Sequence, residues 1–374
     1  MSNTKRRNHR RRNRSRRNRS RRKKFGQLGG EGLTKYSIMS YNILARGATS
    51  HQEAGHKFHF ENNTNPIESK PSQYEHIEQT LQRFIKIVDE IKKANPDIVL
   101  LQEVDNYFYT YLLKHLPIYT GYFKLYIPVP RGDLSANFAT AIIWKSDLFE
   151  LMSAETLDSE SYYADQLPLI EEVDRIKSPF DNKNATLVTL REKKSSHTIP
   201  SSESESTADI ISVVSVHLPG DKSKQNSAID SKKRLISYIL QKMANNTAKL
   251  KLIGGDLNCP IFVESCPTDT EIVCCYRWIS QQMAENGFEK VNQETSGITT
   301  CDFDYSSKSH DQTTIDTIFF SANSLEYESY SVQDMDCPDG ESSVYKSGSS
   351  GYADIEYGSD HAWILTNLKK RMSE

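Results

Sequence analysis

Short, nearly continuous apolar runs recur along the chain, and each ends at a polar or turn-forming residue. Runs such as DIVLLQE (97–103) and FATAIIWK (138–145) do not alternate with polar residues, which is typical of strands covered on both faces. The pattern predicts strands in residues 33–44, 97–103, 138–145, 209–218, 249–255, 314–321 and 361–368.

Longer segments between these runs have apolar residues at helical spacing. One spans residues 74–96, and the residues predicted on its apolar face are Ile77, Leu81, Phe84, Ile85, Val88 and Ile91. A second runs from Ile229 to Met243, with a predicted stripe of Ile229, Ile236, Ile239, Leu240 and Met243. A third helix is expected to end near Gly287. Because strands alternate with helices, we predict an α/β fold.

Composition divides the chain near its N-terminus. Residues 1–24 contain 14 Lys or Arg and no acidic residue, whereas the remaining 350 residues hold the other 33 basic residues and all 49 acidic ones. Such an arm cannot bury enough apolar surface to fold. We therefore predict a disordered basic arm in residues 1–32 and one folded domain in residues 33–374, with polar loops at 46–72, 195–208 and 336–358. The arm residues expected to bind nucleic acid are Arg10, Arg11, Arg12, Arg16, Arg17, Arg21 and Arg22.

The sequence contains no expected membrane segment. No apolar stretch reaches the roughly 18 to 20 residues that cross a bilayer, and no apolar core of a secretory signal is present near the N-terminus. We expect an intracellular protein with no membrane partner. The basic arm suits a nuclear or nucleolar address, but the choice between these and the cytoplasm stays open. The six cysteines form no Cys-x-x-Cys pair, so we expect reduced thiols.

Polar side chains gather where the apolar runs stop. In α/β folds ligands commonly bind at strand ends, where a rigid sheet presents side chains. The candidates at these positions are Asn42, Glu103, His217, Asp256, Asn258, Asp316, Asp360 and His361. Each also has a plain structural interpretation: a Glu can be the first exposed residue of a loop, and an Asp after Gly-Gly is often a turn residue. Asp316 is harder to explain in this way, because it lies between apolar residues and an unpaired buried carboxylate is costly.

The segment KLIGGDLNCP (251–260) places Asp256 and Asn258 directly after two glycines. Glycines allow close backbone approach and a sharp exit from a strand. If extended geometry continues, Asp256 and Asn258 project to the same side. One could then act on a water molecule while the other donates a hydrogen bond to the same substrate group.

Six motifs carry a resemblance to a known family. MSYNILA, DIVLLQEV, SVHL, GGDLN, IDTIFF and SDH follow one another in the order of the endonuclease/exonuclease/phosphatase superfamily, across residues 36–368. SYNILA looks most like the deadenylase branch of nocturnin and Angel-type proteins. The resemblance implies a four-layer α/β sandwich, with two packed mixed β-sheets and outer helices, and Mg²⁺-assisted phosphodiester hydrolysis with Mn²⁺ as an alternative cofactor.

The resemblance also implies roles for the residues at the strand ends. Glu103 matches the metal-binding glutamate, with Asn42 and Asp360 beside the metal or the phosphate. Asp256 matches the residue that orients or deprotonates the attacking water. Asn258 and His217 match donors to phosphate oxygens, and His361 with Asp316 matches a His–Asp pair.

The resemblance departs from the poly(A)-specific members at the base pocket. Lys222 and Asp311 occupy positions where those members place a proline and a phenylalanine that sandwich adenine. Base stacking contributes roughly 1 to 3 kcal/mol per base, so adenine preference is expected to be weaker here. RNA is the expected substrate of a 3′-to-5′ exoribonuclease. DNA or a small phosphate ester is the first alternative, and a non-catalytic RNA-binding protein is the second.

The arm generates a first testable prediction. Deleting residues 1–24 should weaken polymer binding and flatten its salt dependence. Without the arm fewer phosphates are neutralised, so fewer counterions are released on binding. Cleavage of a dinucleotide should stay unchanged. Filter-binding titrations of a labelled 30-nucleotide RNA across salt concentrations measure this, and equal binding with and without the arm would remove its proposed role.

Overall fold

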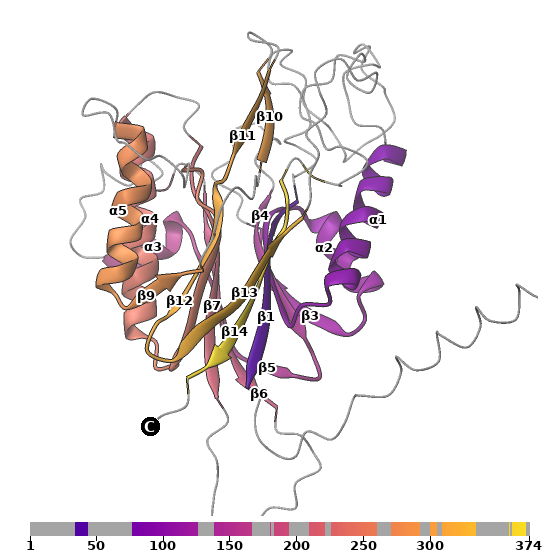
Figure 1. The fold of residues 1–374 in the computed structure, drawn as a ribbon, viewed down its shortest axis with the longest axis horizontal. Helices are drawn as coiled ribbons and strands as arrows, with labels where there is room; N and C mark the ends of the chain where they lie inside the picture. The colour runs from indigo at the N-terminus through magenta and orange to yellow at the C-terminus, as the bar shows by residue number, and fades with distance from the viewer. Residues whose placement is uncertain are drawn as a thin grey trace, which may run out of the picture.

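The computed structural model describes residues 34–43, 77–125, 138–166, 180, 183–193, 209–220, 226–259, 271–291, 300–304, 309–333, 359 and 361–371 (Figure 1). The predicted arm at 1–32, the predicted loops at 46–72, 195–208 and 336–358, and Asp360 lie outside the described residues.

Two six-stranded mixed sheets form the centre of the fold. The first has the order β13 (Leu325–Val332), β14 (Ile364–Lys370), β1 (Lys35–Asn42), β2 (Ile98–Val104), β4 (Ala139–Lys145) and β3 (Tyr119–Phe123). The second has the order β5 (Phe149–Leu157), β6 (Ala185–Glu192), β7 (Ile210–His217), β8 (Leu250–Asp256), β12 (Asp316–Ser321) and β9 (Phe288–Lys290). Each sheet contains one parallel pair, β1 with β2 and β7 with β8, and its other pairs are antiparallel.

Helices cover the outer face of each sheet. A parallel pair needs a crossover connection, and α1 (Ile77–Ala94) follows β1 while α4 (Asn226–Asn245) follows β7. Figure 1 shows α1 and α2 (Asn106–His115) on one side of the two sheets and α4 and α5 (Glu271–Glu285) on the other. A short helix, α3 (Ser159–Gln166), follows β5. The predicted four-layer α/β sandwich is therefore confirmed.

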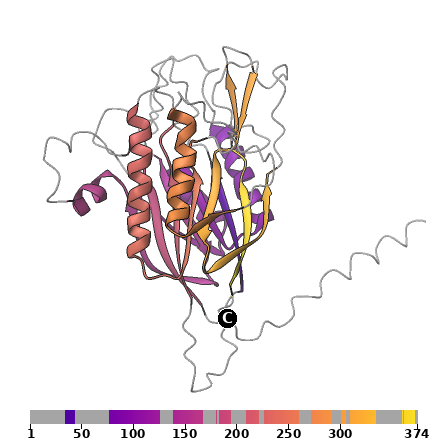
Figure 2. The ribbon, with the colours of Figure 1, turned by 60° about the vertical axis from the view of Figure 1, so that its left-hand side comes forward.

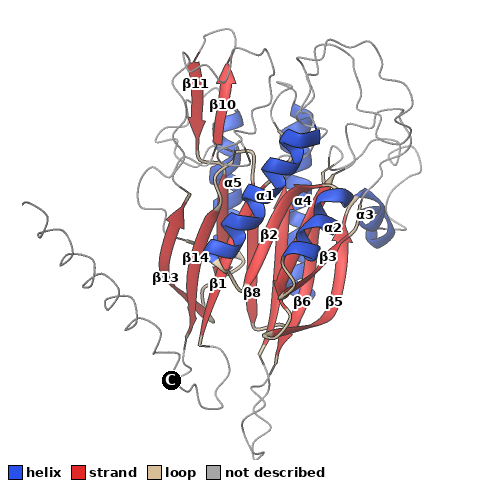
Figure 3. Ribbon diagram, turned by 90° about the vertical axis from the view of Figure 1, so that its right-hand side faces the viewer, coloured by secondary structure: helices blue, strands red, loops and turns tan. Residues whose placement is uncertain are grey.

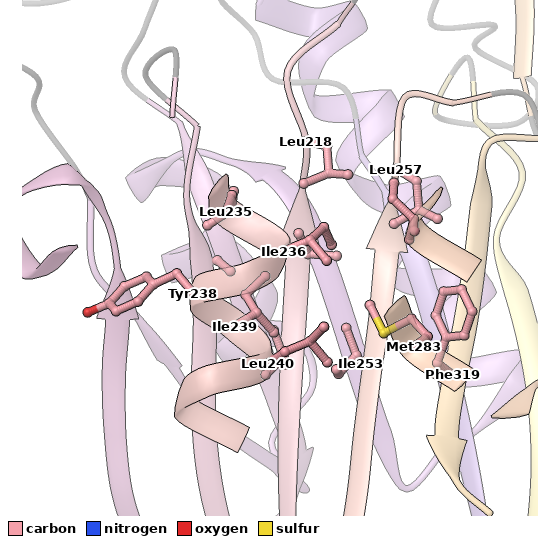
Figure 4. Close-up of a cluster of buried hydrophobic side chains, with 14 of the residues drawn as sticks. Leu218, Leu235, Ile236, Tyr238, Ile239, Leu240, Ile253, Leu257, Met283 and Phe319 are labelled. Carbon is pink, nitrogen blue, oxygen red and sulfur yellow. The ribbon is translucent and has the colours of Figure 1, made fainter. Parts of the chain in front are cut away.

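Three apolar layers hold the sandwich together. On β2, Ile98 and Leu100 face the other sheet, whereas Val99 and Leu101 face the helices, because successive strand residues point to opposite faces. The second sheet packs against α4 and α5 in the same way (Figure 2). In that layer Ile239 and Leu240 of α4 lie against Ile253 of β8 (Figure 4). The continuous apolar runs of the sequence thus correspond to strands buried on both faces.

The buried face of α1 differs from its prediction. Phe84, Val88 and Ile91 are buried as predicted, together with Ile87, but Leu81 and Ile85 are 47% and 43% exposed. The stripe that meets the sheet is narrower than the apolar surface of the helix, so these two residues lie on its flank. The α4 prediction is confirmed for Ile236, Ile239, Leu240 and Met243, which are buried, whereas Ile229 is half-buried.

A two-stranded hairpin, β10 (Thr300–Asp304) and β11 (Ser309–Thr313), leads directly into β12. It projects from one end of the sandwich (Figures 1 and 3). None of the helices in the described part of the chain is long and apolar enough to cross a membrane. Among the residues whose side chains are described, Cys259 and Cys275 are buried free thiols.

Two glycines at the end of β8 permit close backbone packing. A Cβ on Gly254 would lie 2.8 Å from Leu100 Cδ1 of the other sheet. Gly255 has φ +144°, and a Cβ there would lie 2.0 Å from the carbonyl oxygen of Val216. A Cβ on Gly255 would therefore collide with the backbone of β7, whereas one on Gly254 would collide with the side chains of Leu100 and Ile318.

A prediction follows for these glycines. Gly255→Ala should lower the free energy of unfolding by about 3 kcal/mol or more, because both strain and a backbone clash oppose the new methyl group. Gly287→Ala is the matched control: Gly287 has φ +79° and open space around it, so only the left-handed backbone opposes the change, at roughly 1 to 2 kcal/mol. Urea unfolding measures both, and equal losses would contradict the clash.

Candidate active site

Strand pairing places three polar residues side by side at one end of the second sheet. The parallel register of β7 and β8 sets His217 opposite Asp256. The antiparallel register of β8 and β12 sets Asp316 opposite Asp256 from the other side. Asp256 therefore lies between an imidazole and a second carboxylate, and all three side chains are buried.

The first sheet contributes Asn42 and Glu103 at the same end. Asn42 ends β1, and its partner in the parallel register is Gln102, the residue before Glu103. Glu103 has φ +57°, in the left-handed region, and the ladder between β2 and β4 shifts between Leu101 and Val104. Such a backbone costs on the order of 1 to 3 kcal/mol for a residue other than glycine and is found mostly at functional sites. Glu103 therefore lies at an irregular, strained end of β2.

The two sets of residues converge on Asp256. Asn42 Nδ2 donates a hydrogen bond to Asp256 Oδ2 over 3.1 Å. His217 Nε2 lies 3.5 Å from Asp256 Oδ2 and 3.7 Å from Glu103 Oε1. His361 Nε2 lies 4.0 Å from Asp256 Oδ2. Residues more than 300 positions apart in sequence thus form one polar cluster at the end of the sandwich.

Asp256 and Asn258 act together through a turn. Asn258 has φ +48°, so extended geometry does not continue beyond the strand. The Asn258 amide N–H donates to Asp256 Oδ1 over 2.7 Å, and its side-chain Nδ2 donates to Leu218 O over 2.8 Å and to Asp256 Oδ2 over 3.3 Å. Lys232 Nζ, on α4, donates to Asn258 O over 2.7 Å. Asp256 and Asn258 are therefore turn residues and candidate site residues at the same time, because the turn holds the Asp256 carboxylate in position.

His361 and Asp316 form the predicted pair. His361 Nδ1 lies 3.0 Å from Asp316 Oδ2, and His361 Nε2 lies 3.3 Å from Asn42 Nδ2. Because a carboxylate only accepts and the amide nitrogen only donates, the proton is on Nδ1 and Nε2 is the acceptor. Ser359 Oγ donates to Asn42 O and accepts from the His361 amide N–H. Asn42 and His361 therefore hold each other in place.

Burial and charge shift two groups in the cluster. Burial, with a contribution from the nearby Asp316 carboxylate, raises the pKa of Asp256 to about 7. Burial, followed by the positive charges of Lys183 and His361, lowers the pKa of His217 well below its usual value. His217 is therefore neutral at neutral pH, and Asp256 can exchange a proton near that pH.

The oxygen donors of the cluster fit a hard divalent cation. Among the described residues no three His, Cys, Asp or Glu side chains group as a ready-made metal site. Mg²⁺ needs fewer protein ligands, since it is usually held by one or two carboxylates with waters and phosphate oxygens. Glu103 and Asn42 offer a carboxylate and an amide oxygen at the ends of adjacent parallel strands. Asp360, the third predicted ligand, lies outside the described residues.

The structure brings most of the predicted residues together. Those in the cluster are Asn42, Glu103, His217, Asp256, Asn258, Asp316 and His361. Sequence reasoning missed Lys183, Phe138 and Lys232, which contact the cluster. No motif singles them out, since they lie on a helix or just before strands.

The two packed mixed sheets, with a carboxylate cluster at one end, define a fold used by hydrolases of phosphate esters. Residues 39–361 match the Endonuclease/Exonuclease/phosphatase family, and the chain belongs to that family. A 132-residue stretch is 25% identical to "Carbon catabolite repressor protein 4 homolog 3" of Arabidopsis thaliana, and this match covers 35% of the chain and 25% of the plant protein.

Two solved structures share the fold. The human Nocturnin catalytic domain with bound sulfate has a TM-score of 0.53 at 19% identity, covering 91% of this chain and 96% of that one. ANGEL2, a 2′,3′-cyclic phosphatase in complex with adenosine-2′,3′-vanadate, has a TM-score of 0.55 at 16% identity, covering 93% of this chain and all of that one. At these identities the likeness shows the fold alone.

The raised pKa of Asp256 generates a prediction for the protein without divalent cations. A folded-state pKa of about 7 against 3.8 means that the folded state binds a proton more tightly, so its contribution to stability is complete below pH 4 and is lost as the pH rises to 7. Asp256→Asn removes the ionisable group, so the variant does not lose stability in this way as the pH rises. We expect the variant to be more stable than the wild type at pH 8, by a few kcal/mol at roughly 1.4 kcal/mol per pKa unit.

Chemical unfolding in EDTA at pH 5 and pH 8 measures the difference. The stability gained by Asp256→Asn over the wild type should be smaller at pH 5 than at pH 8. A variant that is less stable than the wild type at pH 8 would show that Asp256 contributes to stability as an ionised group.

Proposed function

We propose that the protein is a Mg²⁺-dependent phosphodiester hydrolase that acts on RNA as a 3′-to-5′ exoribonuclease. The observation that supports this most is the convergence of Glu103 and Asp256, from different sheets, within 4 Å of the same His217 nitrogen. The buried carboxylates of Asp256 and Asp316, the half-buried carboxylate of Glu103, two imidazoles and two amides suit the binding and attack of a phosphate ester.

Glu103 and Asn42 would hold the metal ion, with Asp360 as a third ligand. Bound there, Mg²⁺ or Mn²⁺ would polarise the phosphoryl group and neutralise charge on the leaving oxygen. The left-handed backbone of Glu103 supports this assignment, because it turns the carboxylate toward the cluster at a cost in strain.

Asp256 would orient the attacking water and take its proton. Its raised pKa near 7 suits a general base that works at neutral pH. The hydrogen bonds from Asn42 and Asn258 hold both carboxylate oxygens, so the base is fixed before substrate arrives. Asn258 and His217 would line the phosphate side of the site. Asp316 fixes the tautomer of His361 and would favour its protonated form when a phosphate lies in front of it.

RNA is the proposed substrate because the comparisons favour the deadenylase branch. The sequence match to the plant carbon catabolite repressor homologue and the fold likeness to nocturnin support it. The expected role of the basic arm also supports it, since 14 positive charges would hold a polyanion. The unusual Lys222 and Asp311 in the expected base pocket argue for weaker poly(A) preference.

A second candidate is hydrolysis of DNA or of a small phosphate ester such as a cyclic phosphate. The likeness to ANGEL2 favours this alternative, and the metal centre would be the same. A non-catalytic RNA-binding role is less favoured, because the residues of the cluster are all present and oriented by hydrogen bonds.

Activity assays with matched variants test the proposal. With Mg²⁺ or Mn²⁺, the wild type should shorten RNA from its 3′ end, and Asp256→Asn should lower kcat by about 10² to 10⁴-fold because the base is lost. Glu103→Gln should lose activity and regain part of it at high metal concentration. The control is Glu150→Gln, which breaks only an exposed ion pair with Arg191.

A panel of 3′-labelled and 5′-labelled RNAs with different tails, the matching DNA and a 2′,3′-cyclic nucleotide separates the candidates. If the protein cleaves DNA or the cyclic ester and leaves RNA intact, RNA is not its substrate and the second candidate function is correct. Full activity in Asp256→Asn would remove the general-base assignment, and no cleavage of any substrate would leave the binding role.

A further inference from the structure

Lys183 brings a positive charge into the cluster. It lies just before β6, at the end of the second sheet that holds His217 and Asp256. Its Nζ lies 3.0 Å from His217 Nε2, the same nitrogen that lies within 4 Å of both Glu103 and Asp256. Lys183 is partly buried.

The position of Lys183 is fixed by both sheets. Its amide N–H donates to Phe180 O over 2.9 Å. The next residue, Asn184, accepts hydrogen bonds at Oδ1 from the backbone N–H and the hydroxyl of Thr140 on β4, over 3.1 and 3.2 Å. The backbone that carries the lysine therefore belongs to the rigid contact between the sheets.

Phe138 holds the side chain of Lys183 against the imidazole. The Lys183 ammonium lies 4.9 Å from the centre of the Phe138 ring, and that ring stacks on His217 with centroids 6.1 Å apart. A cation over an aromatic face is attracted to it, and the ring restricts water on that side. Lys183, Phe138 and His217 thus form a small preorganised unit beside the carboxylates.

The direction of the hydrogen bond changes the role of His217. An ammonium group only donates, so a ring nitrogen bonded to Lys183 must be an acceptor. Lys183 Nζ lies 3.0 Å from His217 Nε2 and 3.4 Å from His217 Nδ1, so the neutral imidazole accepts from the ammonium group through one of these nitrogens. The donor with a positive charge at this place is Lys183.

We propose that Lys183 is a phosphate-binding residue that contacts a non-bridging oxygen of the substrate, beside His217. Phe138 and His217 are positioning residues that hold its ammonium group there. The ligand chemistry is a phosphate group, in a diester substrate or as a phosphate product. This inference rests on the proposed function for its catalytic meaning, but the binding of phosphate can be measured without turnover.

The test compares phosphate affinity in Lys183→Gln, Lys183→Arg and the wild type. Isothermal titration with inorganic phosphate, at constant Mg²⁺ and ionic strength, should give an affinity about 10- to 100-fold weaker in Lys183→Gln, because a charge-assisted hydrogen bond is lost. Lys183→Arg keeps the charge and should recover most of the affinity. Lys249→Gln is the control for loss of one positive charge and should bind as the wild type does, because Lys249 is exposed and directly precedes β8, at the end opposite to Asp256.

Each outcome decides the inference. Equal phosphate affinity in Lys183→Gln and the wild type, with the same unfolding midpoint, would overturn it and leave Lys183 as a counter-ion of the carboxylates. No phosphate binding by the wild type would overturn it as well. If phosphate binding falls in Lys183→Gln but the wild type hydrolyses no substrate, the proposed function fails and the phosphate site stands.

Discussion

The register of β8 between its neighbours is the constraint on which the site depends. Asp256 at its end is opposite His217 on β7 and opposite Asp316 on β12, and a shift by one residue would turn its side chain to the other face of the sheet. Two glycines allow this register, because a Cβ on Gly255 would collide with β7 and one on Gly254 would collide with Leu100 across the sandwich. The two glycines thus permit both the close contact of the sheets and the position of the Asp256 carboxylate.

The cluster works against stability, and the rest of the fold compensates for it. A left-handed Glu103 and a desolvated Asp256 both raise the free energy of the folded chain. Three apolar layers, one between the sheets and one beneath each pair of helices, offset this cost. Hydrogen bonds between the sheets, such as Gln102 Nε2 to Ser215 Oγ at 3.0 Å, lie directly below the cluster and keep both halves aligned. Strain at the site is therefore held by a rigid frame, as catalysis by preorganised groups requires.

The sequence predicted most of the buried strands. β1, β2, β4, β7, β8, β12 and β14 were predicted because apolar runs carry a strong signal. The buried strand β6 was missed, because threonines interrupt its apolar residues in ATLVTLRE. The edge strands β5 and β13 were missed because FELMSAETL and LEYESYSV mix polar and apolar residues, and in β5 Leu151 and Met152 face solvent. The strand-end residues were found because they interrupt apolar runs and match family motifs. Lys183 was not, because only the fold brings it beside His217, and the backbone turn at Asn258 cannot be read from its spacing to Asp256.

The proposed metal site depends on Glu103, which would hold one divalent cation together with Asn42 of the adjacent strand and Asp360, beside Asp256 of the second sheet. Electron paramagnetic resonance of Mn²⁺ titrated into the full chain, compared with Glu103→Gln, measures this directly. The account predicts one tight Mn²⁺ per wild-type chain and at least tenfold weaker binding in Glu103→Gln, with the fold unchanged by circular dichroism. Equal Mn²⁺ affinity in the two proteins would contradict it.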